Sequence, residues 1–146
     1  MTPKSHVILV IEDSDDDFMF FQRACRQLGA PVTLQRLHNA DEARAYLEEL
    51  NPKDENLWPI LIFLDLNLPG TDGRSFLQEL KTSEQLKVLP VVVYSTSTSI
   101  ADVRFCYANH ANAFHQKHLD YDQMKSELSD ILQYWTTRVR PPTRHE

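Results

Sequence analysis

Five side chains capable of chemistry stand at or just after the ends of apolar runs in this chain: Glu12, Asp13, Asp65, Ser95 and Lys117. Asp65 raises the sharpest question, because it directly follows the apolar residues of the segment ILIFLDLNLPGTDG. Ionisation of a carboxyl group at the edge of an apolar, low-dielectric region costs free energy unless a nearby charge compensates it. The rest of the chain must therefore supply that compensation.

The apolar runs alternate with amphipathic stretches along the chain. Four clear runs rich in Val, Ile and Leu are followed by a weaker one: Val7–Ile11, Val32–Leu37, Ile60–Leu64, Val91–Tyr94 and Ala111–His115. Such alternation is typical of a parallel sheet covered by helices on both faces. We therefore expect an α/β fold in the order βαβαβαβαβα, a doubly wound (βα)5 unit with a five-stranded parallel sheet.

Helix start and stop signals mark the stretches between the runs. The segment DSDDDFMFFQRACRQLG opens with candidate N-cap residues and closes on Gly29, a candidate C′ glycine. Asn39 is expected to cap the second helix, with Glu42 three residues later in the spacing of a capping box. Further helices are expected in GRSFLQEL, SIADVRFCYANH and YDQMKSELSDILQYWTTRV, and a long loop in NPKDENLWP.

The acids Asp15, Asp16 and Asp17 fall in the first turn of the first expected helix. They could add metal ligands, but acids in a first turn are favoured by the helix dipole. We therefore interpret them as solvated residues that stabilise the start of the helix.

Composition limits the classes of function. At 146 residues the chain is expected to form one domain, residues 1–146, with a core at about 6–138 and a tail at 139–146. A formal charge of −6 argues against nucleic-acid binding, which needs a basic face. The N-terminal apolar run in MTPKSHVILVIEDSD is too short for a membrane span or a signal segment. Two cysteines without metal-ligand spacing fit a reducing compartment, so we expect a soluble cytoplasmic protein.

The carboxyl ends of parallel strands form the ligand-binding edge of an open sheet. There the carboxylates of Glu12, Asp13 and Asp65 would repel one another, and Mg²⁺ is the hard, oxygen-preferring cation that neutralises such a group. Lys117 can offset one further charge. Asp65 is then equipped to attack a phosphoryl group, with Ser95 donating a hydrogen bond to a phosphoryl oxygen. The expected product is an aspartyl phosphate on Asp65.

Four segments resemble, in the right order, the receiver domains of two-component response regulators of the chemotaxis-regulator-like type: ILVIEDSDDD, DLNLPGTDG, VVVYSTS and AFHQK. The resemblance implies a flavodoxin-like fold and a histidine kinase as the source of the phosphoryl group on Asp65. It also implies that Asp13 and Asp65 bind Mg²⁺ through their side chains. Asn67 would contribute its backbone carbonyl, and Glu12 would act through water.

The same resemblance assigns further roles. Ser95 and Lys117 would bind the phosphoryl group, and Phe114 would be the aromatic switch residue that changes rotamer with Ser95. Two positions depart from the receiver pattern: His118 stands where most receivers have proline after a cis bond, and Thr96 stands where Ala or Gly is usual. The first departure leaves open a trans or a non-proline cis bond before His118. The second suggests slow autodephosphorylation.

Further features resemble the single-domain regulators associated with phytochromes. They are the proline-punctuated loop before the third strand, the segments DLNLPGTDGR and LPVVV, and a last helix that leads to Trp135 and a proline-containing tail. The implied partner is a phytochrome-type histidine kinase. The implied output is a phosphorylation-dependent protein contact or a homodimer through the last two helices and the fifth strand.

Two other functions compete with a stand-alone phosphoacceptor. A degenerate receiver would bind a partner without phosphorylation, but this chain has every expected site residue. A phosphohydrolase with an aspartyl nucleophile would usually carry a second Asp two residues later as general acid, whereas this chain has Asn67. We therefore expect a phosphoacceptor that assists its own phosphotransfer and dephosphorylation, and not a conventional enzyme.

Overall fold

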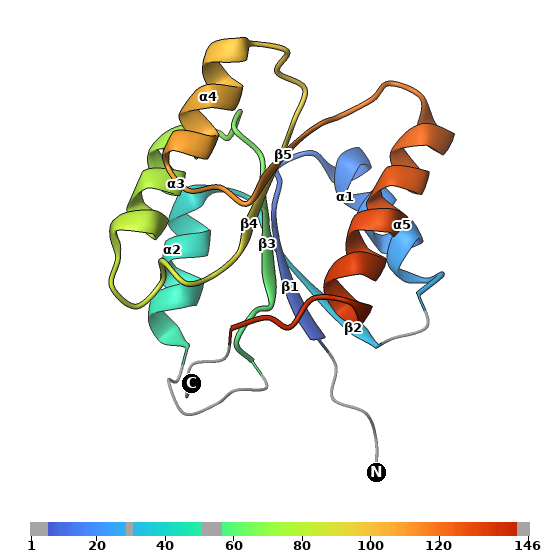
Figure 1. Ribbon diagram of the computed structural model, residues 1–146, viewed down its shortest axis with the longest axis horizontal. Helices are drawn as coiled ribbons and strands as arrows, with labels where there is room; N and C mark the ends of the chain where they lie inside the picture. The colour runs from blue at the N-terminus through green and yellow to red at the C-terminus, as the bar shows by residue number, and fades with distance from the viewer. Residues whose placement is uncertain (1–5, 29–30, 51–56, 143–146) are drawn as a thin grey trace.

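The computed structural model describes residues 6–28, 31–50 and 57–142, in which strands and helices alternate along the chain (Figure 1). The strands are β1 (His6–Ile11), β2 (Val32–Leu37), β3 (Leu61–Leu64), β4 (Val91–Ser95) and β5 (Ala113–Gln116). The helices are α1 (Asp15–Cys25), α2 (Ala40–Glu49), α3 (Gly73–Thr82), α4 (Ile100–Ala108) and α5 (Tyr121–Thr137). The expected βαβαβαβαβα order is therefore confirmed. The candidate C′ glycine of α1, Gly29, and residues 51–56 of the predicted loop lie outside the described residues.

The strands pair in parallel in the order β2-β1-β3-β4-β5. The chain thus passes from β1 to β2 on one side and then returns to β3 on the other, which confirms the doubly wound five-stranded sheet. In the register of β1 and β3, Ile11 pairs with Leu64. The residues that follow these two, Glu12 and Asp65, consequently emerge together where the strand order reverses, the usual ligand position in an open sheet.

Helices cover both faces of the sheet, with α1 and α5 on one face and α2, α3 and α4 on the other (Figure 1). Successive residues of β1 alternate between these faces. Leu9 and Ile11 join the core under α2, α3 and α4, while Ile8 and Val10 join the core under α1 and α5. Burial on both faces explains the unbroken Val, Ile and Leu content of the central strands. Across the described ranges, the helices are too short or too polar to cross a membrane.

Helix caps hold two of the loops at the carboxyl edge of the sheet. Ser14 Oγ accepts a hydrogen bond from Asp17 N–H (3.2 Å) at the start of α1. Asn39 Oδ1 accepts one from Glu42 N–H (2.8 Å), as predicted for α2. The return bond differs from that of a capping box, because Glu42 Oε2 accepts from His38 N–H (2.7 Å) rather than from the N-cap residue itself.

The fifth strand begins at Ala113 rather than at the expected Ala111, because Ala111 takes part in the turn that ends α4. Ala111 N–H donates to Cys106 O (3.0 Å) and His110 N–H donates to Tyr107 O (3.0 Å). His110 has a φ of 68°. These features form a Schellman motif, in which glycine is the usual residue at the position of His110. The turn therefore uses Ala111, which the apolar pattern assigned to the strand.

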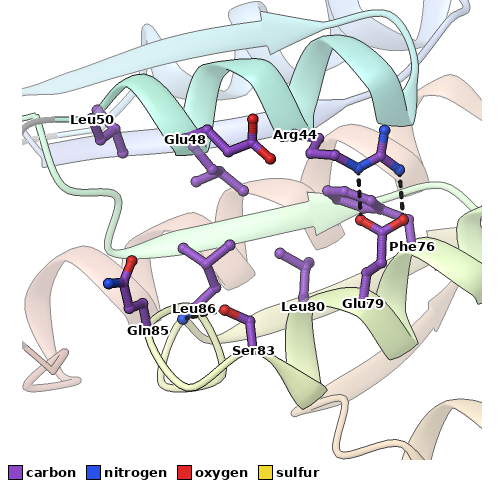
Figure 2. A pocket seen from close by; sticks show the side chains of 10 residues that line it. Arg44, Glu48, Leu50, Phe76, Glu79, Leu80, Ser83, Gln85 and Leu86 are labelled. Carbon is purple, nitrogen blue, oxygen red and sulfur yellow. Dashed lines mark hydrogen bonds and ion pairs between the residues drawn. The ribbon is translucent and has the colours of Figure 1, made fainter.

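A groove of about 390 Å³ lies between α2 and α3 (Figure 2). Leu47, Phe76 and Leu80 contribute apolar side chains to its lining. Arg44 of α2 donates two hydrogen bonds, of 2.8 and 2.5 Å, to the carboxylate of Glu79 in α3 (Figure 2). This pair connects α2 with α3.

Candidate functional site

Glu12, Asp13 and Asp65 come together where β1 and β3 end. One carboxylate oxygen from each lies within 4.8 Å of the others. Glu12 N–H donates to Leu37 O (2.9 Å), which extends the β1–β2 ladder past the strand end. Asp65 N–H donates to Ile11 O (3.2 Å) and extends the β1–β3 ladder in the same way. Glu12 and Asp65 are buried whereas Asp13 is exposed, so the group opens to solvent on one side.

Lys117 reaches this group from the end of β5 and is 7% exposed. Its backbone N–H donates to Ser95 O (2.8 Å) and so extends the β4–β5 ladder. Its ammonium donates to Glu12 Oε1 in a short contact. It also donates to Asp17 Oδ2 at 2.8 Å and to Asp65 Oδ2 at 3.1 Å. An ammonium has three N–H groups, so each of them has a carboxylate partner.

The charges in this group shift the pKa values of its members. Burial lowers the pKa of Lys117, but the negative charges of Glu12 and Asp65, together with its hydrogen bonds, outweigh burial and raise the pKa above its ordinary value. Burial raises the pKa of Glu12 to about 8, the Lys117 charge opposes that rise, and the Asp65 charge adds to it. One ammonium therefore compensates the carboxylates incompletely, and a further cation would favour their ionised forms.

The loop after β3 is packed tightly around Asp65. Asp65 Oδ1 accepts a hydrogen bond from Asn67 N–H (3.1 Å), and Leu66 O accepts one from Gly73 N–H (3.0 Å). Gly70 adopts a φ of 75° in the turn between them. A Cβ on Gly73 would lie 2.2 Å from Asp65 O and 2.6 Å from Leu66 Cα. The start of α3 approaches Asp65 this closely because residue 73 has no side chain.

The two expected switch residues, Ser95 and Phe114, lie on adjoining strands. Ser95 ends β4 and is fully buried, and its hydroxyl accepts a hydrogen bond from Ser97 N–H (3.2 Å). Phe114 pairs in register with Val93, two residues before Ser95, and packs partly buried against the core under α2, α3 and α4. Residues two apart in a strand point to the same face, so both side chains point to that face of the sheet. Tyr107 Oη accepts a hydrogen bond from Phe114 N–H (3.2 Å).

Asp17 is the residue of this site that the sequence analysis missed. Its first-turn position in α1 favoured a dipole role over metal binding, yet its carboxylate binds Lys117, 100 residues away in the chain. Asp15 instead pairs with Arg36 (2.6 Å), which also donates to Glu12 O (3.1 Å). No local pattern distinguishes these acids from one another, because the packing of α1 against α5 and the sheet decides which of them meets the lysine.

A second set of polar contacts joins the loops after β3 and β4. Arg74 donates two hydrogen bonds to Asp102 (2.8 and 2.7 Å) and two to Asp72 (both 3.1 Å). Ser97 Oγ donates to Asp102 Oδ2 (2.6 Å). Hydrogen bonds from Arg74 and then from Ser97 lower the pKa of Asp102 to about 2. The network connects the start of α3 with the start of α4 and with the loop that follows Ser95.

The two departures from the receiver pattern have clear positions. The bond between Lys117 and His118 is trans, as are the other peptide bonds of the described residues. His118 Nε2 lies 3.0 Å from Glu127 Oε1 in α5, so this side chain anchors the loop after β5. Thr96 is exposed and directly follows buried Ser95. Its predicted effect on autodephosphorylation stays a prediction.

Comparisons of the sequence with known proteins agree with this geometry. A family model described as the response regulator receiver domain matches residues 8–129. The chain is 36% identical over 136 residues to the probable methanogenesis regulatory protein FilR2 of Methanothrix harundinacea (strain 6Ac), covering 93% of this chain and 87% of that protein. It is 34% identical over 136 residues to response regulator Rcp1 of Synechocystis sp. (strain ATCC 27184 / PCC 6803 / Kazusa), covering 93% of this chain and 92% of that protein.

Two solved structures are similar over nearly the whole chain. The Mn²⁺-bound form of response regulator Rcp1 has a TM-score of 0.86 at 34% identity, covering 94% of this chain and 99% of that chain. The phosphorylated cyanobacterial phytochrome response regulator RcpA has a TM-score of 0.87 at 33% identity, with coverage of 94% and 99%. The expected similarity to phytochrome-associated regulators is thus confirmed. Fold, site and sequence agree, and the chain belongs to the response regulator receiver domains, a family of phosphoacceptors rather than conventional enzymes.

Proposed function

We propose that this protein takes a phosphoryl group from a histidine kinase onto Asp65. The observation that carries the proposal is one buried ammonium, Lys117, bound to the carboxylates of Asp65 and Glu12 beside solvent-facing Asp13. This set supplies a nucleophile, a cation for the incoming anion and an opening to solvent in one place. Residues 1–146 act as one receiver domain, with a core at about 6–138 and a tail at 139–146.

Mg²⁺ fits the residues present, because the clustered donors are carboxylate oxygens and one of the carboxylates faces solvent. Asp13 and Asp65 would hold the ion through their side chains, and Asn67 would do so through its backbone carbonyl. Glu12 would act through water, because Oε1 accepts from Lys117 and Oε2 accepts from the backbone N–H two residues later (3.3 Å). When bound, Mg²⁺ would supply positive charge to phosphoryl oxygens. The relative Rcp1 has been solved with Mn²⁺ bound.

The chemical step uses few protein groups. A carboxylate oxygen of Asp65 attacks the phosphorus of a phosphohistidine and forms an O–P bond. The P–N bond breaks, and its electron pair goes to the imidazole nitrogen, which takes a proton from solvent. Lys117 and Ser95 donate hydrogen bonds to oxygens of the transferred group. In dephosphorylation, water attacks the phosphorus, the P–O bond to Asp65 breaks, and inorganic phosphate leaves the regenerated carboxylate.

The output of phosphorylation would appear on the surface formed by α4, β5 and α5. Ser95 and Phe114 point to the same face of the sheet, so a Ser95 hydroxyl that turns toward the phosphoryl group leaves room for Phe114 to change rotamer. The backbone of Phe114 is bonded to Tyr107 of α4, which couples strand and helix (3.2 Å). Tyr107 and Tyr134 are exposed on this surface. We propose that it forms a homodimer or binds another protein.

A phytochrome-type histidine kinase is the partner that the similarity to RcpA, a phytochrome response regulator, supports. Such a kinase would act on this protein in the cytoplasm, and we expect neither nucleic-acid nor membrane binding. The test is transfer from a purified, labelled phytochrome-type kinase, compared with a labelled histidine kinase that has no chromophore-binding domain. We expect faster transfer from the phytochrome-type kinase. Equal rates would contradict the phytochrome assignment and leave the phosphoacceptor role intact.

The direct test of the phosphoacceptor role is the intact mass of the protein after incubation with acetyl phosphate, with Mg²⁺ or with a chelator. We expect a phosphoryl adduct on the wild type with Mg²⁺ only. Asp65→Asn keeps the size of the side chain but removes the nucleophilic carboxylate, so it should form no adduct. A folded wild type without an adduct would contradict the proposal and favour a receiver that binds its partner without phosphorylation.

A further inference from the structure

We propose that Asp17 is a positioning residue for Lys117, whose ammonium it holds in place while Asp65 changes from a carboxylate to an acyl phosphate. The inference rests on the proposed phosphoacceptor function. It adds to the site a residue from the first turn of α1, a helix that otherwise contributes no side chain to the carboxylate group at the ends of β1 and β3.

The contact between Asp17 and Lys117 is as direct as the contacts inside the carboxylate group. Asp17 Oδ2 lies 2.8 Å from Lys117 Nζ, closer than Asp65 Oδ2 at 3.1 Å. The side chain of Lys117 is 5% exposed and that of Asp17 is 26% exposed. Solvent therefore reaches Asp17 but hardly reaches Lys117. Hydrogen bonds between two charged groups at this distance are among the stronger ones in proteins. The centroid of the Tyr94 ring lies 5.8 Å from Nζ, so this ring limits the lysine on another side.

The position of Asp17 in α1 would predict a different contact. It lies three residues after the N-cap Ser14, the position from which the side chain of a capping box bonds back to the N–H of the N-cap residue. That N–H donates to Glu12 Oε2 instead (3.3 Å). The carboxylate of Asp17 is bound to Lys117, so capping of α1 does not account for its orientation.

Phosphorylation changes which partners the ammonium can keep. In the carboxylate form, Asp65 Oδ2 accepts one of its three N–H groups (3.1 Å). In an acyl phosphate the negative charge lies on the phosphoryl oxygens, so that N–H must turn toward one of them. Glu12 and Asp17 remain as acceptors for two of the N–H groups and fix the direction of the third. Without Asp17, Glu12 alone would hold the ammonium. The ammonium would then point away from the phosphoryl group for part of the time.

The test compares Asp17→Ala with Asp16→Ala, which removes the same charge from the neighbouring, exposed residue of α1. Phosphorylation by acetyl phosphate is followed by intact mass at saturating Mg²⁺, and the affinity for Mg²⁺ is measured separately by calorimetry. Relative to Asp16→Ala, we expect Asp17→Ala to be phosphorylated about tenfold more slowly, which corresponds to roughly 1.4 kcal/mol in the barrier. Asp17→Asn keeps an oxygen that accepts from Lys117, so it should be slowed by roughly threefold.

Several outcomes would overturn the inference. One is an equal rate for Asp17→Ala and Asp16→Ala, and another is a loss confined to Mg²⁺ affinity with an unchanged rate at saturation. Equal slowing by Asp17→Asn and Asp17→Ala would also overturn it, because charge rather than position would then explain the effect. If Asp17→Ala does not fold, Asp17→Asn against Asp16→Asn decides the question. A wild type that forms no adduct would refute the proposed function instead.

Discussion

Replacing Gly73 by alanine should disturb the loop that carries Asp65. The added Cβ would lie 2.2 Å from Asp65 O, which is 0.8 Å short of the 3.0 Å that real Cβ contacts keep. It would also lie 2.6 Å from Leu66 Cα. Both neighbours are backbone atoms, so no side-chain rotation can relieve the clash. Either α3 or the segment that contains Asp65 must move by a large fraction of an ångström.

This displacement sets the expected magnitude of two effects. Overpacking of a buried site costs about 1–3 kcal/mol, and the rigid neighbours of Gly73 favour the upper end of that range. Alanine restricts the unfolded chain more than glycine does, which offsets roughly 0.4–1 kcal/mol. We therefore expect the free energy of unfolding to fall by about 2 kcal/mol. A shift of the nucleophile by about 1 Å can reduce a reaction rate by about 10²-fold, so phosphorylation of Asp65 should slow markedly.

Urea unfolding measures the first effect, and the rate of adduct formation with acetyl phosphate and Mg²⁺ measures the second. Gly70→Ala is the matched control, because its φ of 75° strains an alanine although no atom lies within 4 Å of the added Cβ. It should cost about 1–2 kcal/mol and leave the phosphorylation rate close to that of the wild type. A Gly73→Ala protein with the unfolding midpoint and the phosphorylation rate of the wild type would refute the reasoning.

The contacts between α3 and α4 yield two further predictions. Arg74→Asp opposes Asp102 and should slow phosphorylation by loosening Ser97 beside the site, and adding Asp102→Arg should restore part of the rate. Arg44→Asp is the control, because it breaks the Arg44–Glu79 pair of Figure 2 and should lower stability without slowing phosphorylation. Similar slowing by Arg74→Asp and Arg44→Asp would contradict this role of Arg74. Hydrogen bonds from Arg74 and Ser97 lower the pKa of Asp102 from 3.8 to about 2. The ionised form of Asp102 therefore stabilises the fold fully above pH 3.8, and this contribution is lost as the pH falls through 2. After allowance for solvent screening we expect this contribution to the free energy of unfolding to be at most about 1 kcal/mol. Urea unfolding of the wild type and of Asp102→Asn should show a stability difference that shrinks from pH 7 to pH 3. A difference that stays constant over this range would contradict the prediction.

The fold and the centre of the site could be predicted because both follow from local patterns. Apolar runs at strand spacing imply a parallel sheet, and parallel strands bring their carboxyl ends to one edge. Residues that directly follow such runs, as Glu12 and Asp65 do, are therefore brought together by the sheet alone, however the helices pack. The register agrees with this inference, because Ile11 pairs with Leu64 at the ends of the two strands.

Contacts that depend on how a helix is docked could not be predicted in this way. Asp15, Asp16 and Asp17 are identical side chains in one helical turn, and the sequence gives all three the same preference for the helix start. In the structure, Asp15 meets Arg36, Asp16 is exposed and Asp17 meets Lys117. The difference arises from rotation of α1 about its axis, which depends on long-range packing rather than on the local sequence.

The two polar networks hold the two sides of Asp65 differently, and this bears on how the site responds to phosphorylation. On the β5 side, all three N–H groups of Lys117 are bound to carboxylates whose positions are set by β1, β3 and α1. On the β4 side, the Ser95 hydroxyl accepts one bond, from Ser97 N–H, and can still donate its own proton. A phosphoryl group can therefore gain a donor from Ser95 without the loss of an existing bond, whereas Lys117 must exchange one. The Ser95 hydroxyl is accordingly the group of the site that can turn toward a phosphoryl oxygen, and Asp17 of α1 helps to hold the ammonium still.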